Sequence, residues 1–261
     1  MMENRAELRR QVEAWTRRDP LRYGYLLDFF DRGGQVEALT EDGITLYNPN
    51  IDIAYVAGKG GDLSFLDGCN LILLEDPDTA KALEGVRPVF PCHQMIYTKK
   101  EPPVVQNPAV TTRMLTQDDV AFVVENYHNP GAYESHIRRR IQEGMVGGMI
   151  DGQLAGFAGV HEEGCIGMLE VIPRFRRRGV AEVLEAQVIA MQMERGKWPY
   201  VHVLVGNTAS ECLQKKLELT VYSGASLGEE FDGELARAGA LKARMPYQTN
   251  KDLRDAICVI R

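Results

Sequence analysis

The sequence lacks any run of apolar residues long enough to cross a membrane. A bilayer-spanning helix needs about 20 predominantly apolar residues in succession, and none of the 261 residues belongs to such a run. The first seven residues, Met-Met-Glu-Asn-Arg-Ala-Glu, are charged and do not resemble a secretion signal. These two absences predict a cytoplasmic protein with no membrane partner.

Cysteine and positive charge are also scarce. The five cysteines are Cys69, Cys92, Cys165, Cys212 and Cys258, and no two have the Cys-x-x-Cys spacing. The pattern indicates neither a disulfide framework nor a metal site, so we expect buried, reduced thiols. The formal net charge is −7. Because nucleic-acid binding depends on a surplus of Lys and Arg, this balance argues against a nucleic-acid partner.

What the chain does have is the composition of a globular protein, with 44% hydrophobic and 26% charged residues. At about 100–200 residues per domain, its length predicts two domains. The segment 99–108 is polar, has no apolar period and contains three prolines, which is typical of a linker. We therefore expect an N-terminal domain at 1–105 and a C-terminal domain at 106–261.

The most informative stretch begins with a β-prone run at 165–172 and ends in a predicted helix at 180–194. Between them lie Pro173, four arginines and Gly179, and the helix begins with Val180 and the small residue Ala181. The N–H groups of a first helical turn have no intrahelical partner and carry the positive end of the helix dipole. A strand, tight loop and helix in this order predict an anion site, and a pyrophosphate is a candidate ligand. The alternative is that the arginines are only a solvated charge run.

Local signals predict the remaining elements. Thr116 and Asp119 have the spacing of a helix capping box, and Asp151-Gly152 is typical of a hairpin turn. Helices are predicted at 116–127 and 133–143, and strands at 147–160 and 200–205. The first hundred residues predict a helix at 21–30 and strands at 36–40, 44–47, 51–56 and 70–74. The tail predicts a closing strand at 255–260 after a helix-prone segment, 234–243.

Two motifs resemble those of the GNAT superfamily, the acyl-CoA-dependent N-acyltransferases. Arg176-x-x-Gly179-x-Ala181 follows Val171-Ile172-Pro173, as in the family's motif A. Residues 207–219 resemble motif B and match it at Asn207, Ser210, Leu213, Lys216 and Leu217. The resemblance implies an α/β chain of the α+β type, with a mixed, mostly antiparallel central sheet flanked by helices. The N-terminal half is similar to the degenerate GNAT-like half of tandem proteins such as the glycine N-acyltransferase relatives.

The resemblance also implies a function, the transfer of an acetyl or short acyl group from acyl-CoA to a primary amine of a small molecule or amino acid. Acetyl-CoA or another acyl-CoA would be the cosubstrate, with no metal. The implied CoA-binding residues are Leu169, Val171, Ile172, Arg176, Arg177, Arg178, Gly179, Val180, Ala181, Asn207, Ser210 and Leu213. The alternative is a catalytically inactive acyl-CoA-binding regulator, and either a monomer or a homodimer is compatible with the sequence.

The chain departs from the family where proton transfer is concerned. Gln214 stands where the family often has a tyrosine that protonates the departing thiolate, and Cys165 stands where a glutamate base is frequent. Glu170 and His202 are the candidate bases, because both can take a proton from the attacking amine. An ion pair with a nearby arginine would equally explain Glu170, and a hydrogen-bonded core position would explain His202. His161 and Glu162 lie at an expected turn, which explains them without a function.

Overall fold

In the computed structural model, the chain folds into two compact units. The first comprises Met1–Met95, His202–Thr208 and Val221–Arg261, and the second comprises Ile96–Val201 and Ala209–Thr220. The structure describes residues 5–58, 69, 71–75, 89–127, 133–222 and 256–260. Each unit contains its own sheet, and each is described by itself.

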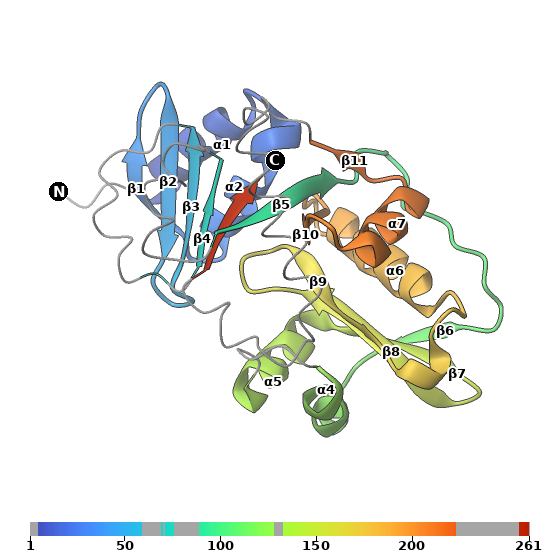
Figure 1. The fold of residues 1–261 in the computed structure, drawn as a ribbon. Coiled ribbons are helices and arrows are strands. Elements are labelled where there is room, and N and C mark those ends of the chain that lie inside the picture. The colour runs from blue at the N-terminus through green and yellow to red at the C-terminus, as the bar shows by residue number, and fades with distance from the viewer. Residues whose placement is uncertain are drawn as a thin grey trace. The chain divides into compact units, whose positions relative to one another are not determined.

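The second unit is built on an antiparallel sheet with the order β6-β7-β8-β9 (Figure 1). Its strands are β6 (Thr111–Met114), β7 (Val146–Ile150), β8 (Gln153–Val160) and β9 (Ile166–Val171). Its helical segments are η2 (Gln117–Asp119), α4 (Val120–Asn126), α5 (Glu134–Gly144), η3 (Pro173–Phe175), α6 (Val180–Glu194) and α7 (Thr208–Lys216). The predicted order of helices and strands in this part of the chain is therefore confirmed.

Two consecutive glycines of β7 show how helices approach this sheet. A Cβ atom built at Gly148 would lie 3.2 Å from Val180 Cγ1 of α6, so the missing side chain permits close helix packing. Successive residues of a strand face opposite sides. On the other side, a Cβ at Gly147 would meet Leu115 and Leu154 side chains. The sheet is thus packed on both faces, with α6 on one of them.

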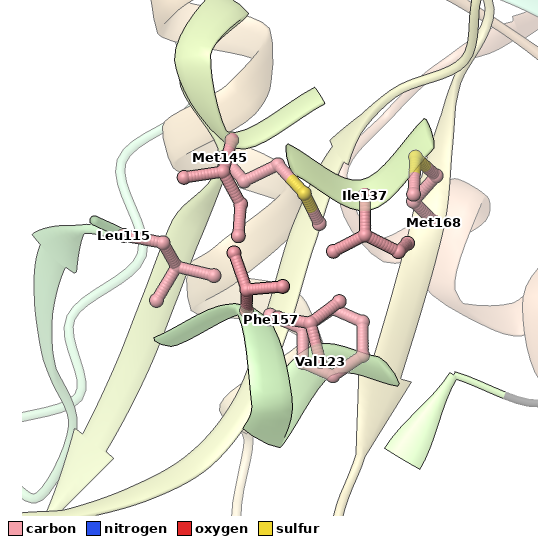
Figure 2. Close-up of a cluster of buried hydrophobic side chains, with 8 residues drawn as sticks. Leu115, Val123, Ile137, Met145, Phe157 and Met168 are labelled. Carbon is pink, nitrogen blue, oxygen red and sulfur yellow. The ribbon is translucent and has the colours of Figure 1, made fainter. Parts of the chain in front are cut away.

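A buried cluster fills the face opposite α6 (Figure 2). It combines residues of α4, α5, β8 and β9 with one residue next to β6 and one next to β7, namely Leu115, Val120, Val123, Ile137, Ile141, Met145, Phe157 and Met168. Phe157 and Met168 are respectively 0% and 2% exposed. Burial of a side chain of this size contributes about 1.5–3 kcal/mol, so the cluster fixes β8 and β9 against the two helices.

The predicted capping box at Thr116 and Asp119 is present. The Thr116 N–H donates to Asp119 Oδ2 at 2.8 Å, and Arg113 pairs with the same carboxylate at 2.7 Å. These hydrogen bonds and the charge of Arg113 lower the pKa of Asp119. The cap fixes the point at which the chain leaves β6 and enters the helical segment.

The first unit has a mixed sheet with the order β1-β2-β3-β4-β12-β5-β10. Its helices are α1 (Arg5–Thr16) and α2 (Pro20–Asp31), and its strands are β1 (Gln35–Leu39), β2 (Gly43–Asn48), β3 (Ile53–Gly58), β4 (Leu71–Leu74), β5 (Val89–Ile96), β10 (Tyr200–Leu204) and β12 (Ala256–Ile260). A short strand, β11 (Thr220–Val221), pairs with β5. The predicted helix at 21–30 and the four predicted N-terminal strands are found, whereas α1 and β5 were not predicted.

The closing strand β12 lies between β4 and β5 and is parallel to both. This pairing associates the end of the chain with the first unit, whereas the sequence placed it in a domain at 106–261. The boundary at 105/106 stays a prediction, because compact units need not fold independently. The predicted helix at 234–243 and most of the glycine-rich segment 58–61 lie outside the described residues.

The α+β class with helix-flanked sheets is confirmed, but the prediction of buried, reduced thiols is wrong at two positions. Cys69 and Cys165 are buried and belong to no disulfide, whereas Cys212 is exposed and Cys92 is disulfide-bonded. Sequence spacing misses such a bond because the fold decides which thiols meet. In the described residues, no helix has the length and apolarity to span a bilayer. The same residues contain no cluster of three His, Cys, Asp or Glu side chains suited to a metal.

Candidate functional site

The loop between β9 and α6 has the backbone geometry of an anion cradle. Phe175 N–H donates to Ile172 O at 2.8 Å and Arg176 N–H donates to Pro173 O at 3.2 Å, which closes a tight turn after the strand. Arg177 and Gly179 then have positive φ angles of 61° and 76°. Left-handed residues next to a helix start turn successive N–H groups toward one concavity, the arrangement that binds anions.

The start of α6 leaves backbone donors free for a ligand. Gly179 is its N-cap residue and has no side chain that could cap the helix. The first hydrogen bond of the helix joins Val183 N–H to Gly179 O at 3.2 Å, and none of the described residues offers an acceptor to the N–H groups of Val180 or Ala181. Because α6 has 15 residues, its dipole adds a positive potential to these donors.

The arginines of this loop have different surroundings, although all are exposed. Arg174 donates to Gln153 Oε1 at 2.9 Å, and Arg176 Nε donates to Val171 O at 3.1 Å. The Arg178 guanidinium lies 5.8 Å from the centre of the buried Phe175 ring. Three of the four arginines therefore have contacts within the second unit, although all four are exposed to solvent.

Strand β9 forms an edge of the four-stranded sheet, so every second backbone group along it lacks a strand partner among the described strands. Ile172 N–H donates to Ala155 O of β8 at 2.9 Å. Since donors alternate along a strand, the N–H groups of Leu169 and Val171 point to the open edge. An extended ligand can bind there as an additional strand. Leu169, Val171 and Ile172 are each half-buried beside this edge.

The second predicted motif forms α7, which packs on α6 through polar contacts. Lys216 Nζ lies 3.3 Å from Glu182 Oε2 of the first turn of α6. The ion pair therefore involves Glu182, the carboxylate that is nearest in sequence to the anion cradle. Ser210 and Leu213 are half-buried on α7, and Asn207 is exposed just before it, with its N–H donating to Leu204 O at 3.0 Å. Asn207 belongs to the first unit, whereas Ser210 and Leu213 belong to the second.

The two candidate bases occupy different units. Glu170 is half-buried on β9 and pairs in register with Phe157 of β8, so it is not the deeply buried carboxylate that the apolar strand suggested. His202 belongs to the first unit, where its Nε2 lies 3.3 Å from Oε1 of the buried Gln94. The centre of its ring also lies 5.9 Å from the ring centre of Tyr25 and 6.2 Å from that of Tyr55. These contacts suit a core histidine, and its role as a base stays a prediction.

A buried carboxyl group on α6 was missed by the sequence reasoning. Glu185 is 3% exposed, and it hydrogen-bonds to Gln214, which is 2% exposed. Burial raises the pKa of Glu185 to about 7, although the bond from Gln214 acts in the opposite direction. The one signal in the sequence was its position between the apolar residues Leu184 and Ala186. Gln214, which replaces the family's tyrosine, therefore contacts a group that can carry a proton near neutral pH.

Comparisons with known proteins bear on this arrangement. The FR47-like protein family matches residues 144–225. A Drosophila protein of known structure has the same fold, with a TM-score of 0.62 at 16% identity, covering 84% of this chain and 94% of that one. A GCN5-related N-acetyltransferase from Kribbella flavida gives a TM-score of 0.48 at 14% identity, covering 78% of this chain and 95% of that one.

A local similarity also links the chain to a larger protein. Succinyl-CoA:acetate CoA-transferase from Clostridium kluyveri is 47% identical over 45 residues, which are 17% of this chain. The match spans 8% of the length of that curated relative. The FR47-like match covers β7 through α7, and therefore includes the cradle, the edge strand and the second motif. Over this segment the chain is similar to the FR47-like family, and its fold is that of the Drosophila protein.

Proposed function

We propose that this protein transfers an acetyl or other short acyl group from acyl-CoA to a primary amine of a small molecule or amino acid. The observation that carries the proposal is the uncapped start of α6 directly after the edge strand β9. A helix start takes a pyrophosphate, and an edge strand takes an extended, amide-containing chain. CoA presents these two groups in succession. The local similarity to a CoA-transferase agrees with a CoA compound as ligand.

In the proposed complex, the N–H groups at Val180 and Ala181 and the side chains of Arg176, Arg177 and Arg178 bind the pyrophosphate. The pantetheine arm lies along β9 and hydrogen-bonds to its open edge. Arg176 Nε donates to Val171 O in the structure. An arm that uses this carbonyl either shares it with Arg176 or displaces the guanidinium, since a carbonyl oxygen has two lone pairs. Asn207, Ser210 and Leu213 are proposed to contact the arm or the nucleotide.

The proposed reaction is a direct aminolysis of the thioester. The amine nitrogen forms a bond to the thioester carbonyl carbon, and the C–S bond breaks to release CoA thiolate. A backbone N–H on the open edge of β9 stabilises the oxyanion, a contribution of about 3–4 kcal/mol for one well-placed donor. Glu170 is proposed to take the proton that the amine loses, directly or through water. Gln214 cannot donate a proton as an acid, so the thiolate is protonated by another group or by water.

Ligand binding and turnover test the proposal separately. A thermal-shift screen compares acetyl-CoA, longer acyl-CoAs, NAD and ATP, and acyl-CoAs are expected to stabilise the protein selectively. At a hundredfold excess over the dissociation constant the gain is about 2.7 kcal/mol. Release of free thiol from acetyl-CoA is then measured against a panel of primary amines. Stabilisation by ATP or NAD but not by acyl-CoA would contradict the assignment.

The alternative is an acyl-CoA-binding regulator without catalysis, and two positions favour it. Gln214 replaces the family's acid, and Cys165 replaces a frequent glutamate base. In this case acyl-CoA would bind with the same selectivity, but no amine would release thiol faster than the uncatalysed reaction. Because Glu170 supplies a carboxylate on β9, we favour catalysis.

A further inference from the structure

The start of β9 contains a bulge that is held by a histidine. Phe157 pairs with Glu170 and Gly159 pairs with Gly167, so two residues of β9 lie opposite the single residue Ala158. The first of the two, Met168, has a φ of 49°, in the left-handed region that non-glycine residues rarely adopt. A backbone in this region costs of order 1–3 kcal/mol and persists only where the surroundings hold it.

His161, the first residue after β8 in the β8–β9 turn, supplies part of this support. Its Nε2 accepts a hydrogen bond from Met168 N–H at 3.3 Å. The imidazole reaches that position because residue 167 is glycine, since a Cβ atom there would lie 2.3 Å from His161 Nε2. The contact thus depends on two residues, and accepting through Nε2 requires the neutral imidazole.

Hydrophobic packing fixes Met168 on its other side. The Met168 side chain is 2% exposed and belongs to the buried cluster, beside Ile137 (Figure 2). The side chain and the amide of one bulge residue are therefore held by two independent contacts. The next residue is Leu169, whose N–H points to the open edge of β9.

We propose that His161 is a positioning residue for acyl transfer, and that it fixes the β9 bulge that sets the direction of the Leu169 N–H and the Glu170 side chain. The inference rests on the proposed function, because those two groups matter only where a thioester and an amine meet at β9. Side chains alternate along a strand, so a bulge that relaxes by one residue exchanges the faces on which Leu169 and Glu170 lie. The loss of one hydrogen bond can thereby misplace both groups.

Protonation of His161 has a defined consequence. An imidazolium carries a proton on Nε2 and cannot accept from Met168 N–H. From α5, Arg140 Nη1 donates to the backbone carbonyl oxygen of His161 at 3.4 Å. The neighbouring Glu162 already pairs with His136 Nδ1 at 3.3 Å and with Arg139 at 3.2 Å. The bulge is therefore expected to loosen as His161 takes up a proton, and turnover is expected to fall on the acid side.

Two substitutions at His161 test this role. His161→Leu removes the acceptor, so kcat is expected to fall about 10- to 100-fold while the dissociation constant of acetyl-CoA changes less than about threefold, since the α6 cradle is untouched. His161→Gln offers an amide oxygen in its place and is expected to recover part of the turnover, without the acid limb of the wild-type pH profile. A structural role alone would lower the melting temperature in both variants and leave the shape of the profile unchanged.

Gly167→Ala reaches the same contact from the other partner, because the added methyl group displaces the imidazole. It is expected to reproduce the loss of kcat. Gly152→Ala is the control for a strained alanine in the same sheet, because its φ of 74° disfavours a side chain but a Cβ atom there meets nothing within 4 Å. Wild-type turnover in both His161→Leu and Gly167→Ala, or an unchanged acid limb in His161→Gln, would overturn the inference.

Hydrogen exchange of the Met168 amide gives a readout that does not depend on activity. The wild type and His161→Gln are expected to protect this amide, and His161→Leu is expected to expose it. Equal protection in all three proteins would overturn the inference whatever the kinetics show. If the wild type released no thiol with any amine, the proposed function would fail, while this measurement would still report on the bulge.

Discussion

Asn107 and Arg178 are 71 positions apart, yet the Asn107 Nδ2 donates to the Arg178 backbone oxygen at 2.9 Å. Asn107 belongs to the segment between β5 and β6, where its Oδ1 also accepts from Ala109 N–H at 3.2 Å. A Cβ atom at Gly179 would lie 2.6 Å from the same Nδ2. The segment predicted to be a simple linker therefore hydrogen-bonds to the loop that forms the anion cradle.

Replacing Asn107 by Ala is expected to weaken acetyl-CoA binding about 2- to 10-fold, because the loop before α6 loses one hydrogen bond worth about 0.5–1.5 kcal/mol. Isothermal titration measures the affinity. Asn126→Ala is the matched control, since Asn126 also donates from its side chain to a backbone oxygen, that of Phe122 at 2.8 Å, but on α4. Equal loss of affinity in both variants would show that the Asn107 contact has no local role.

Replacing Gly179 by Asp is expected to abolish acetyl-CoA binding. The substitution places a carboxylate at the helix start, where the pyrophosphate is proposed to lie, and its Cβ atom collides with Asn107. Gly152→Asp introduces the same charge at another left-handed glycine, with open space around it, and is expected to bind normally. Thermal shift with acetyl-CoA distinguishes them. Wild-type binding by the Gly179 variant would exclude this loop as the phosphate site.

Glu170→Gln is expected to lower kcat by about 10²–10⁴ and to leave acetyl-CoA affinity nearly intact, because the amide keeps the shape of the side chain but cannot take a proton. His202→Ala is the comparison. It is expected to lower the stability of the first unit, since it removes the contacts to Gln94 and the two tyrosines. If the His202→Ala variant lost the acidic limb of the pH–rate profile and the Glu170→Gln variant kept it, His202 would instead be identified as the base.

Glu185 predicts a pH dependence of stability. Its pKa is raised from 4.5 to about 7 in the folded protein, so the folded state holds the proton more tightly than the unfolded state. The resulting stabilisation is fully present below about pH 4.5 and is lost as the pH rises through about 7. It amounts to a few kcal/mol.

Urea unfolding of Glu185→Gln between pH 5 and pH 8 measures this effect. The variant is expected to lose less stability than the wild type over that range, because its neutral amide does not titrate. Glu194→Gln replaces an exposed glutamate at the end of the same helix and serves as the control. If the free energy of unfolding of the Glu185→Gln variant fell with pH as steeply as that of the wild type, this carboxyl group would not be the source of the pH dependence.

Ending the chain at residue 255 is expected to abolish cooperative folding of the first unit. The truncation removes β12, which pairs with β4 on one side and β5 on the other. Two ladders are lost at once in the middle of the sheet. Limited proteolysis should then cleave the first 95 residues rapidly, while fragments of the second unit persist. Wild-type resistance of the N-terminal residues would contradict the observed strand order.

Local patterns predicted the parts of the fold that depend on residues close in sequence. The spacing of Arg176, Gly179 and Ala181 predicted the loop and the start of α6, and Thr116 with Asp119 predicted a helix start. A capping residue or a glycine at a turn acts within a few positions of itself. Such features follow from the order of the residues alone.

The unpredicted features depend on residues that are distant in sequence. Nothing local to Asn107 indicates Arg178, and nothing local to Glu185 indicates Gln214. His161 was explained as part of an exposed turn, but its contact with Met168 depends on a bulge whose register comes from pairing with β8. These contacts require the positions of two segments at once, which hydrophobic periodicity and spacing do not supply.

The place of β12 also determines the order in which the chain can fold during synthesis. The four-stranded sheet has all its strands once Val171 has been made, whereas the sheet of the first unit awaits Ile260. The N-terminal residues therefore leave the ribosome first but complete their sheet last. Until then the facing edges of β4 and β5 have unpaired backbone groups, which in other sheets promote aggregation. Slow translation of the segment before Ile260 is therefore expected to prolong the exposure of strands made earlier.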